Sequence, residues 1–323
     1  MKLRWGILGP GKIANKFVKD LLLIDDCELA SVASRSLEKA ENFARIYGAK
    51  HFYSSYKDLF EDKDIDIIYI ATPHNSHMKF ALEALNHGKH VLCEKPLAIN
   101  KEQVSALIHA ARTNNVFLME AFWTRFNPTM EAVLSKIKND EIGEVNYINA
   151  DFCFYKDADP DSRLFNLELA GGALLDVGVY PIFLSYMIMG YPEDILATAL
   201  LHKTGADLQT SAILKYNKGL STLNCGFRSH SDMVAKIYGT GGKIFIDDRW
   251  HESSGYRVEK DGEVQAFSHP TLGKGFSYEI QECVRCIQAG KIESEKWSHQ
   301  DSLNLISICD EVRRQVGVKY PFE

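Results

Sequence analysis

The chain has 323 residues, 46 % hydrophobic and 25 % charged, which is ordinary for a globular protein able to bury a core without disulfides or metals. Its net charge of −6 argues against a nucleic-acid partner, which would favour a basic surface. No run approaches the ~20 consecutive apolar residues of a membrane span, so we expect no membrane partner. Seven scattered cysteines are typical of a reducing compartment and predict a cytoplasmic protein.

Residues 1–122 alternate short apolar runs with amphipathic segments. The apolar runs predict strands of a parallel sheet that is covered on both faces: Leu3–Leu8, Glu28–Ala33, Ile65–Ala71, His90–Cys93 and Val116–Glu120. The amphipathic segments predict helices over Ile13–Leu22, Leu37–Tyr47, His77–His87 and Lys101–Thr113. The alternation predicts a doubly wound α/β domain over residues 1–122.

Residues 123–323 show a different pattern, with longer β-rich runs. The predicted strands are Val145–Tyr155, Ile195–Leu201, Thr210–Tyr216, Gly219–Phe227, Val234–Tyr238 and Lys243–Ile246. The predicted helices are Met130–Lys138, Gly172–Met189, Tyr278–Ala289 and His299–Val316. These elements predict a second, α+β domain with a large, mostly antiparallel open sheet, and a boundary near Ala121–Pro128.

A glycine-rich turn directly follows the first predicted strand and opens the first helix. It comprises Gly9, Pro10, Gly11, Lys12 and Ile13, followed by Ala14, and so matches G-x-G-x-x-G/A. Gly9 permits the tight turn, Gly11 lets the backbone approach a pyrophosphate, and the helix N-terminus offers free N–H groups. The strand before the motif and the helix after it predict a Rossmann dinucleotide-binding domain.

The end of the second predicted strand indicates which dinucleotide binds. An acid at this position binds the ribose 2′-hydroxyl of NAD, but here the strand ends in Ser34, Arg35 and Ser36. A guanidinium recognises phosphate in a bidentate manner, so Arg35 and Ser34 favour the 2′-phosphate of NADP, with NAD the less favoured cofactor. Alternatively, Ser36 is only the N-cap of the next helix and Arg35 is a solvated surface residue.

Two further segments carry groups suited to chemistry. Glu94 and Lys95 stand at the C-terminal end of a buried parallel strand, where α/β proteins bind ligands, and Pro96 keeps Lys95 out of helical geometry. Asp176 and Tyr180 lie four residues apart on a predicted helix and so share one face. The glycines that precede them suit a close approach to another surface.

With these motifs, the sequence resembles the glucose–fructose oxidoreductase/inositol dehydrogenase family, and within it the branch of dimeric dihydrodiol dehydrogenase and NADP-dependent D-xylose dehydrogenase. The resemblance spans essentially the whole chain. It rests on GPGKIA, SR after the second strand, ATPHNSH at 71–77, EKP at 94–96, LMEAFWTRF at 118–126 and GGALLDVGVY at 171–180. Many sugar-dehydrogenase relatives have His where this chain has Tyr180.

The resemblance implies roles for these residues. Lys95 and Tyr180 flank the reactive carbon of the nicotinamide, Asp176 lies close by, and the Lys95–Pro96 peptide is often cis. A tyrosine titrates near ~10, and a nearby ammonium favours the tyrosinate, so Tyr180 with Lys95 is suited to act as acid and base. Asp176 orients either Lys95 or a second substrate hydroxyl.

Other contacts are also implied by the resemblance. Thr72, Pro73, His74, Asn75, Glu94 and Lys95 join the glycine-rich turn in binding the cofactor. The predicted substrate-binding residues are Trp123, Phe154, Arg163 and Phe276, although core packing is an equal interpretation for the aromatic ones. We predict no metal site, because Cys283-x-x-Cys286 lacks a second pair of ligands and His74 and His77 lack a carboxylate partner.

The sequence therefore predicts an NADP-dependent dehydrogenase or reductase that acts on CH–OH groups of a sugar or related polyol. The alternatives are a trans-dihydrodiol dehydrogenase, a dicarbonyl or anhydro-sugar reductase, and, in another class, a catalytically silent NADP-sensing module. The resemblance also implies a homodimer through the C-terminal sheet, whose second face must be covered.

Overall fold

The computed structural model describes residues 2–323, which form two compact units. Unit 1 contains the chain up to Phe126 together with Thr271–Leu303, and unit 2 contains Asn127–Pro270 together with Asn304–Glu323. The sequence patterns alone predict a single boundary, with all residues after 122 in the second domain. Residues 271–303 return to unit 1, where they add a helix.

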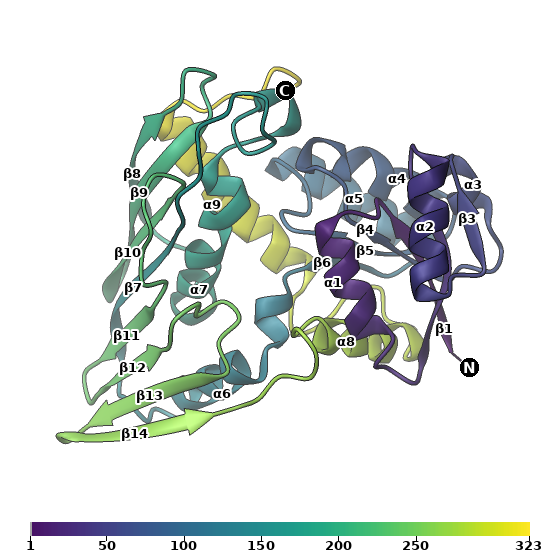
Figure 1. Cartoon of the computed structure of the whole chain (residues 1–323). Helices are drawn as coiled ribbons and strands as arrows, with labels where there is room; N and C mark the ends of the chain where they lie inside the picture. The colour runs from purple at the N-terminus through teal and green to yellow at the C-terminus, as the bar shows by residue number, and fades with distance from the viewer. Residues whose placement is uncertain (1) are drawn as a thin grey trace. The chain divides into compact units, whose positions relative to one another are not determined.

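Unit 1 is built on a six-stranded sheet with the order β3-β2-β1-β4-β5-β6, in which all neighbours pair in parallel. Its strands are β1 (Leu3–Leu8), β2 (Cys27–Ala33), β3 (His51–Tyr53), β4 (Ile67–Ile70), β5 (His90–Glu94) and β6 (Leu118–Ala121). The predicted doubly wound α/β fold is confirmed (Figure 1). The order reverses between β1 and β4, the position at which such sheets bind ligands.

Helices connect the strands of unit 1: α1 (Lys12–Leu21), α2 (Leu37–Tyr47), α3 (Tyr56–Glu61), α4 (His77–Asn86) and α5 (Lys101–Asn114). A further helix, α8 (Ser277–Gln288), comes from the returning segment 271–303. The chain steps from β1 to β2 in one direction and from β4 to β5 in the other, so right-handed crossovers place α1 and α4 on opposite faces. Side-chain caps begin two of the helices, from Ser36 at α2 and Asn100 at α5.

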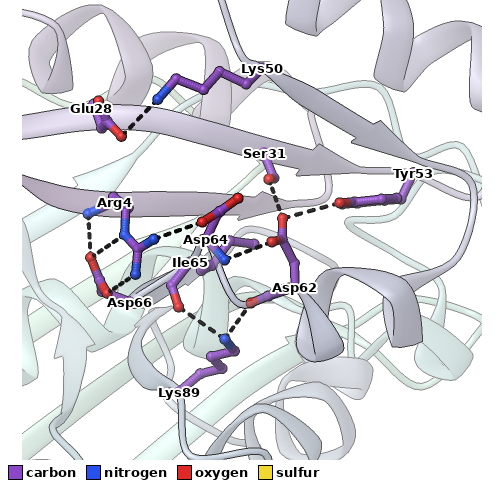
Figure 2. A network of polar contacts seen from close by, with 10 residues as sticks. All are labelled: Arg4, Glu28, Ser31, Lys50, Tyr53, Asp62, Asp64, Ile65, Asp66 and Lys89. Carbon is purple, nitrogen blue, oxygen red and sulfur yellow. Dashed lines mark hydrogen bonds and ion pairs between the residues drawn. The ribbon is translucent and has the colours of Figure 1, made fainter.

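A polar network braces the edge of this sheet where β1, β4 and β5 begin (Figure 2). Arg4 donates to both carboxylate oxygens of Asp66, at 3.0 and 2.8 Å. Lys89 donates to the main-chain oxygens of Asp62 and Ile65, and burial lowers its pKa. The remaining members are Glu28, Ser31, Lys50, Tyr53 and Asp64. The contacts of Arg4, Asp66 and Lys89 thus support the amino ends of β1, β4 and β5, opposite the carboxyl ends where such sheets bind ligands.

Unit 2 contains an eight-stranded sheet with the order β14-β13-β12-β11-β7-β10-β9-β8. Its strands are β7 (Val145–Cys153), β8 (Asp194–Leu201), β9 (Asp207–Tyr216), β10 (Gly219–Gly226), β11 (Ala235–Gly239), β12 (Lys243–Ile246), β13 (Gly255–Lys260) and β14 (Glu263–Ser268). All neighbours pair antiparallel except β7 and β10, which run parallel. The predicted open, mostly antiparallel sheet is confirmed.

Three helices lie on one side of this sheet, α6 (Pro128–Lys138), α7 (Val179–Met189) and α9 (His299–Val316) (Figure 1). By length and composition alone, Leu167–Met189 is apolar enough to cross a membrane, a possibility that the sequence analysis did not identify. Most of this segment is buried, as in the core helix of a folded domain. Its apolar character is therefore accounted for by packing.

Some elements differ from the sequence predictions. The predicted helix Gly172–Met189 consists of a π-helical turn, Leu174–Gly178, followed by α7. β3 and α3 were not predicted because three and six residues carry too little periodicity. The hairpin of β13 and β14 was also missed, because β14 is largely exposed and lacks an apolar face. The dipeptide Asp261-Gly262 is typical of a two-residue hairpin turn and could have predicted it, and both residues have positive φ.

Candidate functional site

The glycine-rich turn lies between the ends of three strands. Gly9 has φ +90°, and its N–H donates to the main-chain oxygen of Ala33 at the end of β2. A Cβ at Gly9 would lie 3.1 Å from the main-chain oxygen of Ala71 and 3.1 Å from the Cγ2 of Thr72. Positive φ and the closeness of the loop after β4 both require glycine here.

The N-terminus of α1 is open. Gly11 occupies the N-cap without a side-chain cap, and the first turn carries no acidic residue. A Cβ at Gly11 would meet only the oxygen of Gly9, at 4.0 Å, so the space in front of it is clear. Lys12 and Ile13 begin the helix, whose first N–H groups carry a partial positive charge. These features fit the pyrophosphate of a dinucleotide.

An exposed arginine, Arg35, follows the end of β2. Arg35 makes no hydrogen bond or ion pair with any residue between 2 and 323. Ser34 accepts the N–H of Ser36, and Ser36 caps α2 by accepting the N–H of Lys39. Ser36 is thus a structural N-cap, as one of the two interpretations held, while the Arg35 guanidinium is free to pair with an anion.

The loop after β4 contains Thr72, Pro73, His74 and Asn75, and His74 begins a 3-10 turn. His77, to which the sequence analysis gave no role, is fully buried behind this loop. Its Nε2 lies 2.8 Å from the main-chain oxygen of Thr72, and its Nδ1 lies 2.8 Å from that of Pro96. His77 therefore joins the loop after β4 to the Lys95–Pro96 segment.

Glu94 and Lys95 end β5, and the Lys95–Pro96 peptide is cis, as the resemblance implied. Tyr69 of β4 donates its hydroxyl to Glu94, and the pKa of Tyr69 is raised by burial and by the charge of Glu94. Glu279 of α8 carries two buried carboxylate oxygens without a hydrogen-bond partner among the described residues. Burial and the nearby Glu94 raise its pKa well above the usual range.

Two predicted substrate-binding residues meet in unit 1. Trp123, just after β6, stacks on Phe276, with ring centroids 4.8 Å apart and planes inclined by 12°. Asp20 of α1 positions Phe276 by accepting its N–H at 2.9 Å, together with that of Lys274. Gly275 has φ +97°, and a Cβ there would lie 3.1 Å from the indole of Trp123. Sequence patterns do not reveal this pairing because it joins distant segments.

In unit 2, Asp176 lies in the π-helical turn, a feature common at functional sites. Arg163 donates to Asp176 at 3.1 Å, and the Asp176 side chain is 16 % exposed while that of Arg163 is 42 % exposed. Gly172 has φ +134°, and a Cβ there would collide with Asp207, which accepts the N–H of Leu174 at 2.8 Å. The expected close approach at these glycines is confirmed, and it anchors the turn.

Tyr180 lies in the first turn of α7 and is 6 % exposed. Its ring lies 5.3 Å from the ring of Phe152 and 5.2 Å from that of His251, which itself stacks on Phe152 at 4.2 Å. Neither Phe152 nor His251 is among the site residues predicted from the sequence. Phe154, a predicted substrate residue, is half-buried and packs against Phe227 at 5.0 Å.

The predicted cofactor residues thus all belong to unit 1 and follow the carboxyl ends of β1, β2, β4 and β5. Lys95, Trp123 and Phe276 also belong to unit 1, whereas Asp176, Tyr180, Phe154 and Arg163 belong to unit 2. Within residues 2–323, no group of three or more His, Cys, Asp or Glu side chains is arranged to hold a metal.

Comparisons with known proteins identify the family. Residues 3–122 match the model of an oxidoreductase family with an NAD-binding Rossmann fold, and residues 130–245 match the GFO/IDH/MocA C-terminal domain. Trans-1,2-dihydrobenzene-1,2-diol dehydrogenase of Xenopus tropicalis is 40 % identical over 337 residues, with 99 % of this chain and 100 % of that protein covered. The NADP(+)-dependent scyllo-inositol 2-dehydrogenase IolU of Bacillus subtilis is 34 % identical, with coverage of 99 % and 98 %.

A solved structure is also similar over nearly the whole chain. KijD10, a 3-ketoreductase from Actinomadura kijaniata in complex with NADP and TDP-benzene, superposes with a TM-score of 0.89, at 25 % identity and 98 % coverage of both chains. The predicted family, fold and oxidoreductase class are confirmed. The chain belongs to the GFO/IDH/MocA oxidoreductase family.

Proposed function

We propose that this protein is an NADP-dependent dehydrogenase that transfers a hydride between the cofactor and a hydroxyl or carbonyl carbon of a sugar or related polyol. The observation that carries the cofactor choice is the exposed Arg35, which follows β2 beside Ser34 and has no partner among residues 2–323. No carboxylate stands at this strand end to bind a 2′-hydroxyl, and a guanidinium suits a 2′-phosphate. The relative and the solved structure that are named with NADP support this choice.

In the proposed reaction, Tyr180 exchanges the proton of the substrate oxygen and Lys95 supplies the positive charge that stabilises the phenolate. Held by the glycine-rich turn and the loop after β4, the nicotinamide cofactor would supply a hydride acceptor, so that the alcohol carbon loses H⁻ while Tyr180 takes the H⁺ of its oxygen and a carbonyl results. In the reductive direction, Tyr180 donates the proton. The buried environment of Tyr180, against Phe152 and His251, excludes water from the phenol and holds its ring.

The substrate is proposed to carry at least one further hydroxyl. Asp176, held by Arg163, offers a carboxylate oxygen that can accept a hydrogen bond from such a hydroxyl. The stacked Trp123 and Phe276, and Phe154 in unit 2, supply aromatic faces that suit the apolar face of a sugar ring or a dihydrodiol. The alternative is therefore a trans-dihydrodiol dehydrogenase, which the 40 % identical relative favours.

The test is a spectrophotometric screen of NADP reduction over aldoses, polyols and trans-dihydrodiols, with NAD in parallel, for the parent and Tyr180→Phe. The parent is expected to reduce NADP with at least one polyhydroxylated substrate. Tyr180→Phe is expected to bind NADP normally and to lose turnover by about 10²–10⁴-fold, the usual contribution of acid–base catalysis. Equal turnover in both proteins would contradict the proposed mechanism, and NADP binding without turnover on any substrate would favour the sensing alternative.

We further propose that the protein is a cytoplasmic homodimer formed through the open face of the unit 2 sheet. That face carries exposed apolar side chains on adjacent strands, Leu196 on β8, Ile213 on β9 and Leu220 on β10. Exposed apolar patches of this kind are typical of protein–protein contacts. The cytoplasmic location is supported by the seven cysteines, all of which are buried and unbridged.

A further inference from the structure

A buried carboxylate lies beside the segment that carries Lys95. Glu120 belongs to β6 and is 3 % exposed, and its backbone pairs with Cys93 of β5. A carboxylate taken out of water is costly unless hydrogen bonds or an opposite charge compensate it. Its retention in the core of unit 1 therefore calls for a physical reason.

Hydrogen bonds supply part of that reason. One carboxylate oxygen of Glu120 accepts the main-chain N–H of Leu97 at 2.9 Å, and the other accepts the indole N–H of Trp297 at 3.2 Å. The hydroxyl of Ser302 also bonds the carboxylate. The first of these donors is two residues from Lys95, so Glu120 holds the backbone turn that follows the lysine.

Nearby charges also affect the Glu120 carboxylate. Burial raises the pKa of Glu120, while its hydrogen bonds and the positive charge of Lys95 act in the opposite direction. Cys93, whose backbone pairs with Glu120, is fully buried, and burial together with the charges of Glu94 and Glu120 raises the pKa of its thiol. Cys93 therefore stays neutral, and the positive charge of Lys95 is near enough to act on the carboxylate of Glu120.

We propose that Glu120 is a positioning residue for the reaction, acting through Lys95: its carboxylate anchors the turn after the lysine and provides the negative charge that keeps the ammonium protonated and in place. The inference rests on the proposed catalytic role of Lys95. Glu94 adjoins Lys95 in the sequence, and one of its carboxylate oxygens accepts the hydroxyl of Tyr69. Glu120 adds a buried charge that Tyr69 does not engage.

The experiment compares Glu120→Gln with Trp297→Phe in the full-length protein. The glutamine keeps the volume and can still accept the N–H of Leu97, but it removes the charge. Trp297→Phe removes one hydrogen bond and leaves the charge. For Glu120→Gln we expect kcat to fall at least 10-fold and the alkaline limb of its pH profile to move down by about one unit, because Lys95 loses its proton more easily. Trp297→Phe is expected to lower stability but to keep the parent's pH limb.

Two outcomes would overturn the inference. In the first, Glu120→Gln keeps the kcat and the alkaline limb of the parent; in the second, Glu120→Gln and Trp297→Phe show the same alkaline limb. Lys95→Met separates the inference from the proposed function. If Lys95→Met keeps full turnover, the proposed function fails; if it loses turnover while Glu120→Gln does not, only the present inference fails. In the Lys95→Met background, Glu120→Gln is expected to add no further loss.

A second variant decides the case if Glu120→Gln does not fold. Glu120→Asp keeps the charge but shortens the side chain, so its carboxylate cannot hold Leu97 as the glutamate does. We expect its kcat to fall while its pH limb stays within about 0.3 units of the parent, since the charge near Lys95 remains. The proposal would be overturned if Glu120→Asp kept the kcat of the parent. It would also be overturned if the alkaline limb of its pH profile moved down by about one unit, the shift expected for a lost charge.

Discussion

Trp123 and Phe276 stack face to face although one follows β6 and the other precedes α8, with ring centroids 4.8 Å apart and planes inclined by 12°. Phe276 is 2 % exposed and Trp123 is 7 % exposed, so both rings are buried and the indole keeps more accessible surface than the phenyl ring. We therefore predict that the indole, rather than the phenyl ring, is the part of this pair that a substrate contacts.

Replacing the indole tests this surface. Trp123→Ala is expected to raise the substrate KM about 10-fold, because lost apolar contact with a sugar or dihydrodiol ring costs roughly 1–2 kcal/mol. The affinity for NADP is expected to stay within about threefold of the parent's, which is the range of a substitution outside the cofactor site. Trp123→Phe, which preserves a stacked ring, is the matched control. Steady-state kinetics would contradict the role if Trp123→Ala left KM unchanged or weakened NADP instead.

Removing the free cation at β2 tests the cofactor choice. Arg35→Ala is expected to weaken NADP by about 10–100-fold, since a hydrogen bond to a charged group contributes roughly 1.5–3 kcal/mol, and to leave NAD nearly unchanged. Arg45→Ala on α2, where Arg45 donates to Asn42, is the control for a lost surface cation. Fluorescence titration with both dinucleotides decides the point, and parallel losses for NADP and NAD would refute a contact with the 2′-phosphate.

The Glu279 carboxyl group, which has no hydrogen-bond partner among residues 2–323, predicts an unusual pH dependence of stability. Because its folded pKa is raised, the folded state keeps this proton above pH ~4.3, the unfolded value, while the unfolded state loses it. The free energy of unfolding therefore falls as pH rises through this range. Glu279→Gln is expected to remove that slope and to stabilise the protein at pH 8 by about 1–3 kcal/mol, measured by urea unfolding at pH 5 and pH 8.

Glu282, on the same helix, is the control with the opposite sign. Although burial opposes it, hydrogen bonds from Arg285 and Ser294 lower the pKa of Glu282 to about 2. Its stabilisation is present above pH ~4.3 and is lost as pH falls towards 2. Glu282→Gln is therefore expected to destabilise the protein at pH 8. A Glu279→Gln variant that is destabilised at pH 8, or a Glu282→Gln variant that is stabilised there, would contradict the behaviour described for that residue.

The open sheet face predicts the oligomeric state. Ile213 is 41 % exposed in β9, and its backbone pairs with Leu196 of β8 and Thr222 of β10. Ile213→Lys is expected to convert a dimer into a monomer, because an interface core does not tolerate an unpaired charge. Ile46→Lys makes the same change at an exposed isoleucine of α2 and is expected to leave the mass unchanged. A monomeric mass for the parent protein, measured by light scattering at micromolar concentration, would contradict the proposed dimer.

Much of unit 1 followed from local patterns. β1 and α2 begin and end where periodicity predicts, and the turn at Gly9 could be recognised because positive φ and an open helix N-terminus leave a short, contiguous signature. The same reasoning missed the β13–β14 hairpin, whose exposed strand lacks an apolar face. It also treated the π-helical turn at Asp176 as ordinary helix, since one inserted residue hardly alters the periodicity.

The amino-acid order alone determined the strand and helix alternation and the phosphate-binding turn, because backbone conformation and apolar periodicity are properties of neighbouring residues. Only the tertiary structure decided which buried polar groups meet. It set Glu120 against Leu97 and Trp297, left Glu279 without a hydrogen-bond partner among residues 2–323, and joined Thr72 to Pro96 through His77. Such contacts depend on how separate segments pack together, and the residues next to each group in the sequence do not indicate which group it will contact.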